Sequence, residues 1–219
     1  MKTRVAPLTI LCLALAAIPA WAQVLYDNGP INGTTDAWTI NFGFLIADSF
    51  ALLNNSTVGG FNIGTWEFVG DRLISLDWAI ESEPNGGTLY GSGTARGSNL
   101  TDRFISVNQY GYDIDEITVT GLNVSLKSGT QYWLTLQNAV VPSGNPVYWD
   151  ENSGAGCGGD DGHGGGCPSM ASSGGVGSDP SEAFTIDGTG GGTTPEPGSF
   201  LLLASGIFGL AGVLRRKLW

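Results

Sequence analysis

The chain has 219 residues and a formal net charge of −11. All 20 acidic residues except Glu196 lie between Gln23 and Thr194, a span whose only basic residues are Arg72, Arg96, Arg103 and Lys127, so its net charge is −15. Binding to DNA or RNA needs basic patches that neutralise phosphates, and this composition argues strongly against it. The acidic balance favours a solvated surface, bound cations, or partners that are neutral or cationic.

The first 22 residues have the three-part pattern of a secretory signal peptide. Lys2 and Arg4 precede an apolar run over residues 5–18, and small residues follow at Ala20 and Ala22. This arrangement predicts cleavage by signal peptidase before Gln23 and export of the mature chain. An uncleaved membrane anchor is the alternative.

Residues 23–187 are predicted to form one all-β domain. Short runs with strand-like alternation are separated by Gly, Asn, Asp and Pro, and no segment shows a sustained helical period. The predicted strands cover residues 38–42, 61–68, 73–80, 88–94, 104–107, 117–126, 132–136 and 183–186. Bulges are expected near Gly64 and Gly121, where the apolar pattern slips. The pattern indicates an antiparallel β-sandwich, either jelly-roll-like or immunoglobulin-like.

Aromatic residues suggest both a core and a candidate sugar-binding site. Trp38, Trp66, Trp78 and Trp133 lie within strand patterns and are expected in the core. The site would be formed by Tyr148, Trp149, Asp150 and Glu151, in a stretch (residues 146–152) that looks like a loop. Rings stack on the apolar face of a sugar, and carboxylates accept hydrogen bonds from its hydroxyls. A buried anchor of the loop is the commoner role for a tryptophan in such a stretch, and it is the first interpretation of Trp149.

Two cysteines remain after signal removal, Cys157 and Cys167, and they bracket a glycine-rich loop. In an exported protein a disulfide between them is expected. A metal site using these cysteines with His163 and Asp160 or Asp161 is the alternative, although the spacing matches no zinc motif. His163 is the only histidine of the chain, so a Ser-His-Asp or Cys-His hydrolase would have to use it on this loop.

Carboxylates gather in three short segments, 113–116, 150–151 and 160–161. A glycosidase needs two carboxyl groups across a cleft, but nothing in the spacing selects a pair. Structural Ca²⁺ is a second use of such oxygen-rich loops, although the chain has no Asp-x-Asp-x-Asp-Gly loop. Plain surface charge accounts for the remaining acids. No other cofactor is expected.

The C-terminal region divides into a tether and a tripartite tail. Residues 188–194 read as a flexible Gly/Thr linker. In the tail, residues 195–219, Pro195, Glu196 and Pro197 precede an apolar helix over residues 200–214 and the basic cluster Arg215, Arg216 and Lys217. Fifteen helical residues span roughly 22 Å, short of a hydrocarbon core of about 30 Å. The basic cluster can snorkel and places the helix end in the cytoplasm.

This tail resembles the sorting signal of the PEP-CTERM family of exported bacterial proteins. The resemblance rests on Pro195–Pro197, the helix 200–214 and Arg215–Lys217. It implies processing near the Pro-Glu-Pro motif by an exosortase, a membrane-embedded cysteine transpeptidase-like enzyme, in a Gram-negative maker of exopolysaccharide. An ordinary C-terminal anchor behind a proline linker is the alternative. The family's tails are joined to many unrelated domains, so the resemblance implies no activity for residues 23–187.

Together these features predict an exported protein at the cell surface or in the extracellular matrix, held transiently in the membrane by its tail. Its expected partners are signal peptidase, exosortase, the membrane and extracellular polysaccharide. We expect a non-enzymatic β-sandwich associated with exopolysaccharide or biofilm matrix. A carbohydrate-binding module is one alternative, and a glycan hydrolase that uses a carboxylate pair is the other.

Overall fold

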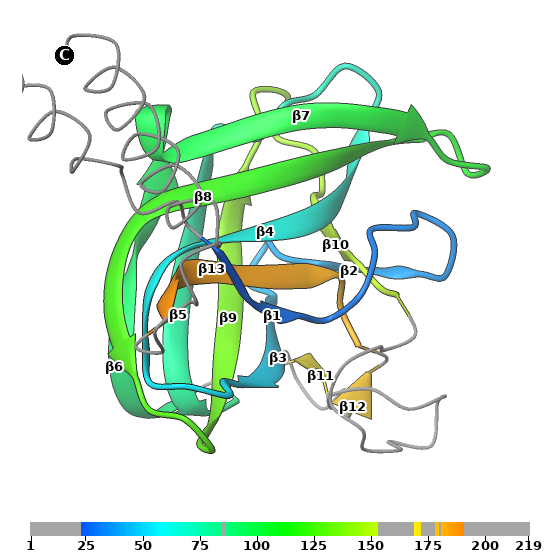
Figure 1. Ribbon diagram of the computed structural model, residues 1–219. Coiled ribbons are helices and arrows are strands. Elements are labelled where there is room, and N and C mark those ends of the chain that lie inside the picture. Colours follow the sequence, from blue (N-terminus) through cyan, green and yellow to red (C-terminus); the bar gives the residue numbers. More distant parts are fainter. Residues whose placement is uncertain (1–22, 85, 153–168, 172–177, 180, 191–219) are drawn as a thin grey trace, which may run out of the picture.

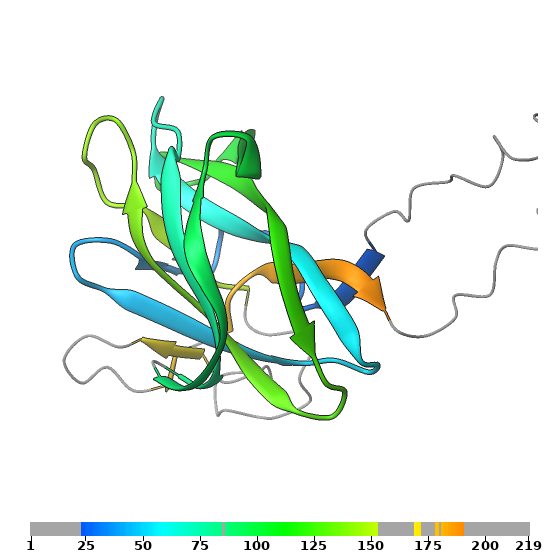
Figure 2. The same cartoon turned by 90° about the vertical axis from the view of Figure 1, so that its left-hand side faces the viewer.

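A computed structural model describes residues 23–84, 86–152, 169–171, 178–179 and 181–190. These residues form two antiparallel sheets packed face to face as a sandwich (Figures 1 and 2). This arrangement confirms the predicted all-β sandwich. The 3₁₀ helix η1 (Gly97–Asn99) connects an edge strand of one sheet, β6 (Gly86–Arg96), to an edge strand of the other, β7 (Leu100–Val107).

Sheet A is built around one long strand, β4, which pairs with β8 along one side and with β13 and then β10 along the other. Strands β7, β1 and β2 extend the sheet beyond β8, β13 and β10. The strands are β1 (Gln23–Asp27), β2 (Ala37–Thr39), β4 (Ser56–Phe68), β7 (Leu100–Val107), β8 (Tyr112–Leu126), β10 (Tyr148–Asp150) and β13 (Phe184–Gly190).

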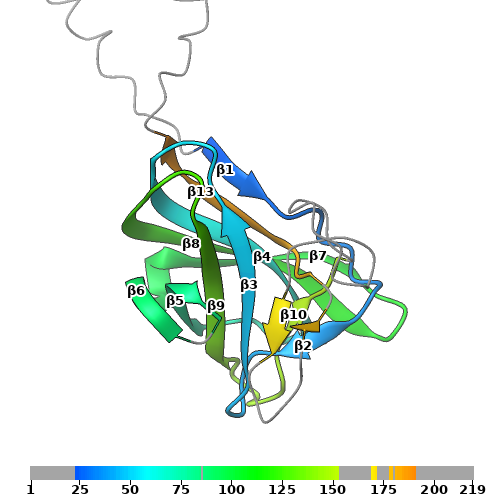
Figure 3. The same ribbon diagram turned by 90° about the horizontal axis from the view of Figure 1, so that it is seen from below.

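Sheet B has the strand order β12-β11-β3-β9-β5-β6. Figure 3 shows β3, β9, β5 and β6 side by side in one layer. The strands are β3 (Leu45–Ala51), β5 (Ser75–Glu83), β6 (Gly86–Arg96), β9 (Gln131–Val140), β11 (Ser169–Ala171) and β12 (Ser178–Asp179).

Seven of the eight predicted runs overlap strands β4, β5, β6, β7, β8, β9 and β13, and the run 38–42 overlaps β2 only in part. Strand β2 ends at Thr39 because the chain turns back, with a hydrogen bond of 3.0 Å from Phe44 N to Asn41 O. Phe42 and Gly43 occupy left-handed conformations in this turn, at φ 56° and 84°. Strands β1, β3, β10, β11 and β12 were not predicted.

The bulge expected near Gly121 is confirmed, and the one near Gly64 is wrong. The β4–β8 register shifts between Val58 and Gly60, opposite Gly121, which has φ 83°. From Gly60 to Phe68 the register is unbroken. The apparent slip at Gly64 arises because β4 carries large apolar residues on both faces: Phe61 and Ile63 on one, Trp66 and Phe68 on the other.

The linker expected at residues 188–194 begins later than predicted, because β13 continues to Gly190. Gly188 is a strand residue that lies against the backbone of β4. A Cβ built on it would approach Thr57 O to 2.1 Å. Glycine is therefore required here for strand packing, and its presence does not mark the start of a flexible segment.

The core lies between the two sheets, and only two of the four tryptophans predicted for it contact it there. Trp38 and Trp78 are partly buried and pack against the core. Trp66 and Trp133 are 6% and 7% exposed but lie outside the core cluster, because Trp66 is on the outward face of sheet A and Trp133 alternates with the inward residues Tyr132 and Leu134 of β9. The largest fully buried side chains are Trp149, Tyr132, Phe50, Phe61, Phe184, Ile40, Ile46, Ile63, Leu76, Ile80, Ile117 and Leu134.

Strand β3 carries a buried carboxylate that explains why its sequence does not alternate cleanly. Asp48 is fully buried and its Oδ2 accepts hydrogen bonds from Glu182 N at 2.7 Å and from Asn28 Nδ2 and Ser181 Oγ at 3.1 Å. Burial raises the pKa of Asp48 well above its usual range, and these hydrogen bonds oppose the shift. The network joins β3 to the segments before β13 and after β1.

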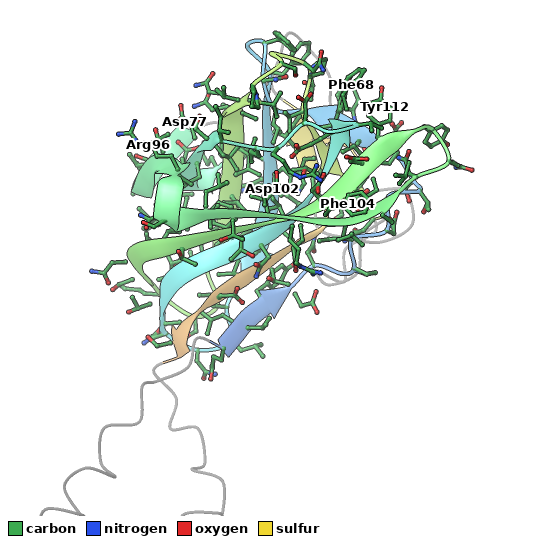
Figure 4. The ribbon with its side chains drawn as sticks, turned by 90° about the horizontal axis from the view of Figure 1, so that it is seen from above. Phe68, Asp77, Arg96, Asp102, Phe104 and Tyr112 are labelled. Carbon is green, nitrogen blue, oxygen red and sulfur yellow. The ribbon has the colours of Figure 1, made fainter. Side chains whose placement is uncertain are left out.

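At one end of the sandwich the inward face of sheet A turns from apolar to acidic. Alternation along β4 and β8 places Glu67, Asp113 and Asp115 on the same face as the core residues Ile63 and Ile117. Asp102 of β7 lies opposite Ile117 and completes what we call the acidic cluster (Glu67, Asp102, Asp113 and Asp115). Figure 4 shows Asp102 over the sandwich, with Phe104 farther along β7.

The acidic cluster has one neighbouring cation and too few hydrogen-bond donors. Arg72 Nη1 lies 3.3 Å from Asp113 Oδ2 and 3.7 Å from Asp115 Oδ1, and its guanidinium carbon is 5.7 Å from the centre of the Phe104 ring. Among the described residues, no backbone or neutral side-chain donor reaches Glu67 Oε2, Asp102 Oδ1 or either Asp115 carboxylate oxygen. Buried carboxylates with too few donors favour their neutral form.

The pKa values follow from this shortage. Burial raises the pKa of Glu67 to about 8, helped by the charges of Asp102 and Asp115 and opposed by the hydrogen bond from Thr65 and by Arg72. Burial likewise raises the pKa of Asp115 to about 7, with Asp102 adding to the shift and Arg72 opposing it. Burial also raises the pKa of Asp102. The folded protein therefore holds protons here that the unfolded chain releases near pH 4 to 5.

Because the pKa of Glu67 is higher in the folded state, its contribution to stability is lost as the pH rises from about 4.5 to 8. Glu67→Gln preserves the shape and the acceptor for Thr65 but cannot ionise. We expect this variant to raise the free energy of unfolding at about pH 9 by on the order of 2 kcal/mol, with little change at about pH 5. Urea unfolding across this pH range measures it.

The matched control is Glu83→Gln, which removes the same charge from an exposed position at the end of β5. The control is expected to leave the slope of stability against pH almost unchanged. Equal effects of the two substitutions would contradict a special role for burial at Glu67.

Candidate functional site

An aromatic cleft opens on the outward face of sheet A, at the same end as the acidic cluster. It has a cavity volume of about 390 Å³. We define the aromatic cleft by the residues that line it: Thr35, Asp36, Ala37, Trp66, Tyr110, Tyr112 and Tyr148. Four of these seven side chains are aromatic, and they come from β4, β8, β10 and the β7–β8 turn.

The rings form a connected series. Trp66 and Tyr110 are stacked, with ring centres 5.6 Å apart and planes inclined by 25°. Tyr112 lies 5.9 Å from Trp66 and meets Tyr148 edge-on at 5.7 Å. Phe68, beside the cleft, meets Tyr112 edge-on at 5.2 Å, and Figure 4 shows these two residues together at one end of the sandwich.

Strand register explains why these residues meet. Trp66 of β4 pairs with Tyr148 of β10, and Phe68 pairs with Tyr112 of β8. These residues share the outward face because side chains alternate along each strand. Sequence positions more than 80 residues apart are therefore neighbours in the cleft.

Tyr110 is presented by a tight turn between β7 and β8. Asn108 Oδ1 accepts hydrogen bonds from Tyr110 N and Tyr112 N, both at 3.0 Å, and Gly111 has φ 83°. An asparagine that caps its own turn and a glycine with positive φ define the backbone on both sides of Tyr110. Tyr110 is 58% exposed, and its ring stacks on Trp66, which is 6% exposed. Tyr110 thus offers the accessible face of this stacked pair.

Asp150 holds the base of the cleft in place without lining it. Its carboxylate is fully buried and accepts hydrogen bonds from Trp66 Nε1 at 2.6 Å, Asn32 N at 2.8 Å and Gly33 N at 3.0 Å. Burial raises the pKa of Asp150, and the three hydrogen bonds oppose the shift. This side chain therefore orients the Trp66 ring. It also anchors Asn32 and Gly33, which lead to the lining residues 35–37 on the other side of the cleft.

Asp36 is the only charged residue that lines the cleft. It is exposed, and its Oδ1 accepts a hydrogen bond from Ala37 N at 2.9 Å, while its carbonyl accepts one from Glu151 N at 3.0 Å. Its neighbour Ala37 pairs with Asp150. The backbone of Asp36 is therefore held against β10, while the carboxylate faces solvent beside the rings.

The predicted site residues Tyr148, Trp149, Asp150 and Glu151 occupy different environments. The expected loop contains strand β10, so alternate residues point to opposite faces. Tyr148 lines the cleft, whereas Trp149 is fully buried, donates from Nε1 to Ala183 O at 3.1 Å and meets Phe184 edge-on. Trp149 is therefore a core residue and offers no ring face to a ligand. Glu151 is 1% exposed and bridges to Glu182.

Burial raises the pKa of Tyr148, and the neighbouring Tyr112 adds to the shift. The hydroxyl therefore stays neutral at physiological pH. Trp66, Tyr110, Tyr112 and Asp36 were not predicted as site residues. The available signal was Asn108-Gln-Tyr110-Gly-Tyr112, an asparagine–glycine turn that displays two tyrosines.

Several predicted features lie outside the described residues. These are the signal peptide 1–22, Cys157, Cys167, His163 and the tail with Pro195, Glu196, Pro197, Arg215, Arg216 and Lys217. Within the described ranges no helix is long and apolar enough to cross a membrane. Within those ranges no group of three or more His, Cys, Asp or Glu side chains could hold a metal ion. The predicted carboxylates Asp160 and Asp161 also fall outside them.

Comparison with known proteins assigns the C-terminus and leaves the sandwich unassigned. No curated protein and no solved structure matches the chain. Residues 193–217 match the family described as the PEP-CTERM protein-sorting motif. This match covers the Pro-Glu-Pro sequence, the apolar segment and the basic cluster singled out from the sequence. The chain therefore carries a C-terminal PEP-CTERM protein-sorting motif, which implies an exported, cell-surface protein that is processed by exosortase.

Proposed function

We propose that the β-sandwich is a non-enzymatic glycan-binding domain, displayed at the cell surface by its sorting signal and associated with exopolysaccharide or biofilm matrix. The aromatic cleft carries this proposal. Sugar rings have apolar C–H faces that pack on aromatic rings, and their hydroxyls need hydrogen-bond partners. The accessible ring of Tyr110, the hydroxyls of Tyr112 and Tyr148, and the Asp36 carboxylate supply both kinds of contact in one cavity.

The size and preorganisation of the cleft support binding of one or two sugar units. Its volume of about 390 Å³ lies at the lower end of the range for small-molecule sites. The turn at Asn108 and the hydrogen bond from Trp66 to Asp150 hold two of its walls before any ligand arrives. A site with preset side chains loses less conformational entropy on binding.

The carboxylates favour binding over hydrolysis. Glycosidases place two carboxyl groups roughly 5 to 9.5 Å apart across the scissile bond. In the aromatic cleft Asp36 is the only lining carboxylate, and Asp150 is fully buried behind Trp66 with three donors on its oxygens. Glu67 and Asp115 of the acidic cluster are fully buried on the opposite face of the same strands. These placements support a non-enzymatic role.

Tyr110→Ala tests the cleft, because this exposed ring can be removed with little loss of core packing. We expect the best neutral oligosaccharide from a glycan array to bind the variant at least tenfold more weakly, since the accessible stacking surface is lost. Isothermal titration calorimetry measures the affinity, and thermal unfolding checks the fold. Phe42→Ala, which removes a ring that is 64% exposed and does not line the cleft, is the matched control. Unchanged affinity in Tyr110→Ala, or no glycan binding at all, would contradict the proposal.

Pro195→Ala combined with Pro197→Ala tests the sorting signal in the native host. Loss of both prolines removes the extended backbone that a processing enzyme recognises. We expect the wild-type protein to be shortened near this motif and the variant to retain peptides through Trp219, as measured by mass spectrometry of the membrane fraction. Pro142→Ala with Pro146→Ala, two prolines of the β9–β10 connection, is the control. Full processing of the tail variant would contradict a role for Pro195 and Pro197 in recognition by the processing enzyme.

A further inference from the structure

Resting on the proposed glycan-binding function, we propose that the ligand of the aromatic cleft is a cationic amino sugar, with a free ammonium group held between the tyrosine rings and the Asp36 carboxylate. The chemistry of the lining narrows the choice among neutral, anionic and cationic sugars. Three observations lead to this assignment: the charge of the lining, the nature of the rings, and the net charge of the domain.

The lining has a negative charge and no positive one. Asp36 is exposed, and none of the other six lining residues is Lys, Arg or His. Two of the four basic side chains between residues 23 and 194 are already paired: Arg72 with Asp113 and Asp115, and Arg103 with Glu116. A uronate, sulfate or phosphate on the sugar would lie beside Asp36 with no counter-charge in the lining. The cleft therefore disfavours anionic glycans.

The rings favour a cation directly. Electron-rich faces of Trp and Tyr attract an ammonium group within about 6 Å of the ring centre, and clusters of such rings are a known solution for binding ammonium. The aromatic cleft brings Tyr110, Tyr112 and Tyr148 into one cavity with a carboxylate at its rim. An N-acetylated or neutral sugar would use the same stacking but would leave Asp36 without an ionic partner.

The field of the whole domain acts in the same direction. Residues 23–194 carry a net charge of −15, which attracts cationic polymers and repels acidic ones over a Debye length of roughly 10 Å at moderate salt. This diffuse attraction is distinct from the specific contact with Asp36. A test of the inference must therefore separate the two.

The experiment compares three hexasaccharides with the intact mature domain: chitosan hexaose with free amines, chitin hexaose with the same backbone N-acetylated, and an oligomeric uronate. Titration calorimetry is done below the pKa of the sugar amine, at low and at moderate salt. We expect chitosan hexaose to bind at least tenfold more tightly than chitin hexaose, and the uronate to show no binding.

Three variants then test whether the preference for the amino sugar depends on the cleft residues. Asp36→Asn is expected to weaken chitosan hexaose at least threefold at moderate salt and to leave chitin hexaose unchanged. Tyr110→Ala is expected to weaken both. Glu83→Gln removes a charge from an exposed residue that does not line the cleft, and it is expected to leave all affinities unchanged.

The outcomes separate this inference from the function on which it rests. Equal binding of the amine and N-acetyl forms, or tight uronate binding, overturns the inference and leaves glycan binding intact. Equal loss in Asp36→Asn and Glu83→Gln shows only diffuse attraction and also overturns it. Absence of binding to all three sugars and to the glycan array overturns the proposed function itself.

Discussion

The buried carboxylate of Asp150 is the interaction on which the described site depends. Its oxygens accept hydrogen bonds from an indole N–H of β4 and from two backbone N–H groups after β1. Burying a carboxylate is costly unless donors compensate it. Here the three donors compensate that cost and, in doing so, join three separate parts of the chain. The position of Trp66, the path of residues 32–37 and the separation of the cleft walls all follow from this junction.

Strands β4 and β8 show how alternation lets one pair of strands serve two environments. Their outward residues Trp66, Phe68 and Tyr112 form or flank the aromatic cleft, while their inward residues Glu67, Asp113 and Asp115 form most of the acidic cluster. Neighbours in sequence are thus separated by the thickness of a sheet. A substitution on one face can alter the other only through the shared backbone.

The sequence predicted the parts that depend on local pattern. Alternating runs located β4 through β9, and the short linear signals at the two ends could be read without a fold. Strand β3 was missed because Asp48 and Ser49 interrupt its apolar pattern, and only distant donors at Asn28, Ser181 and Glu182 make that burial tolerable. The buried role of Trp149 is confirmed, but the strand that buries it was not predicted, because the alternation of a three-residue strand is too short to recognise. The cleft depends on the register between β4, β8 and β10, which no local pattern reveals.

The pairing of β1 with β13 determines where the described chain ends lie relative to the aromatic cleft. Gln23 lies opposite Gly188, so the described chain enters and leaves sheet A on neighbouring strands at one end. Gly190 pairs with Ser56 at the start of β4, and Trp66 lies ten residues farther along that strand. At about 3.3 Å per residue this places the cleft roughly 33 Å from the point where the C-terminal segment departs. The aromatic cleft is therefore separated from the described C-terminal end by most of the length of β4.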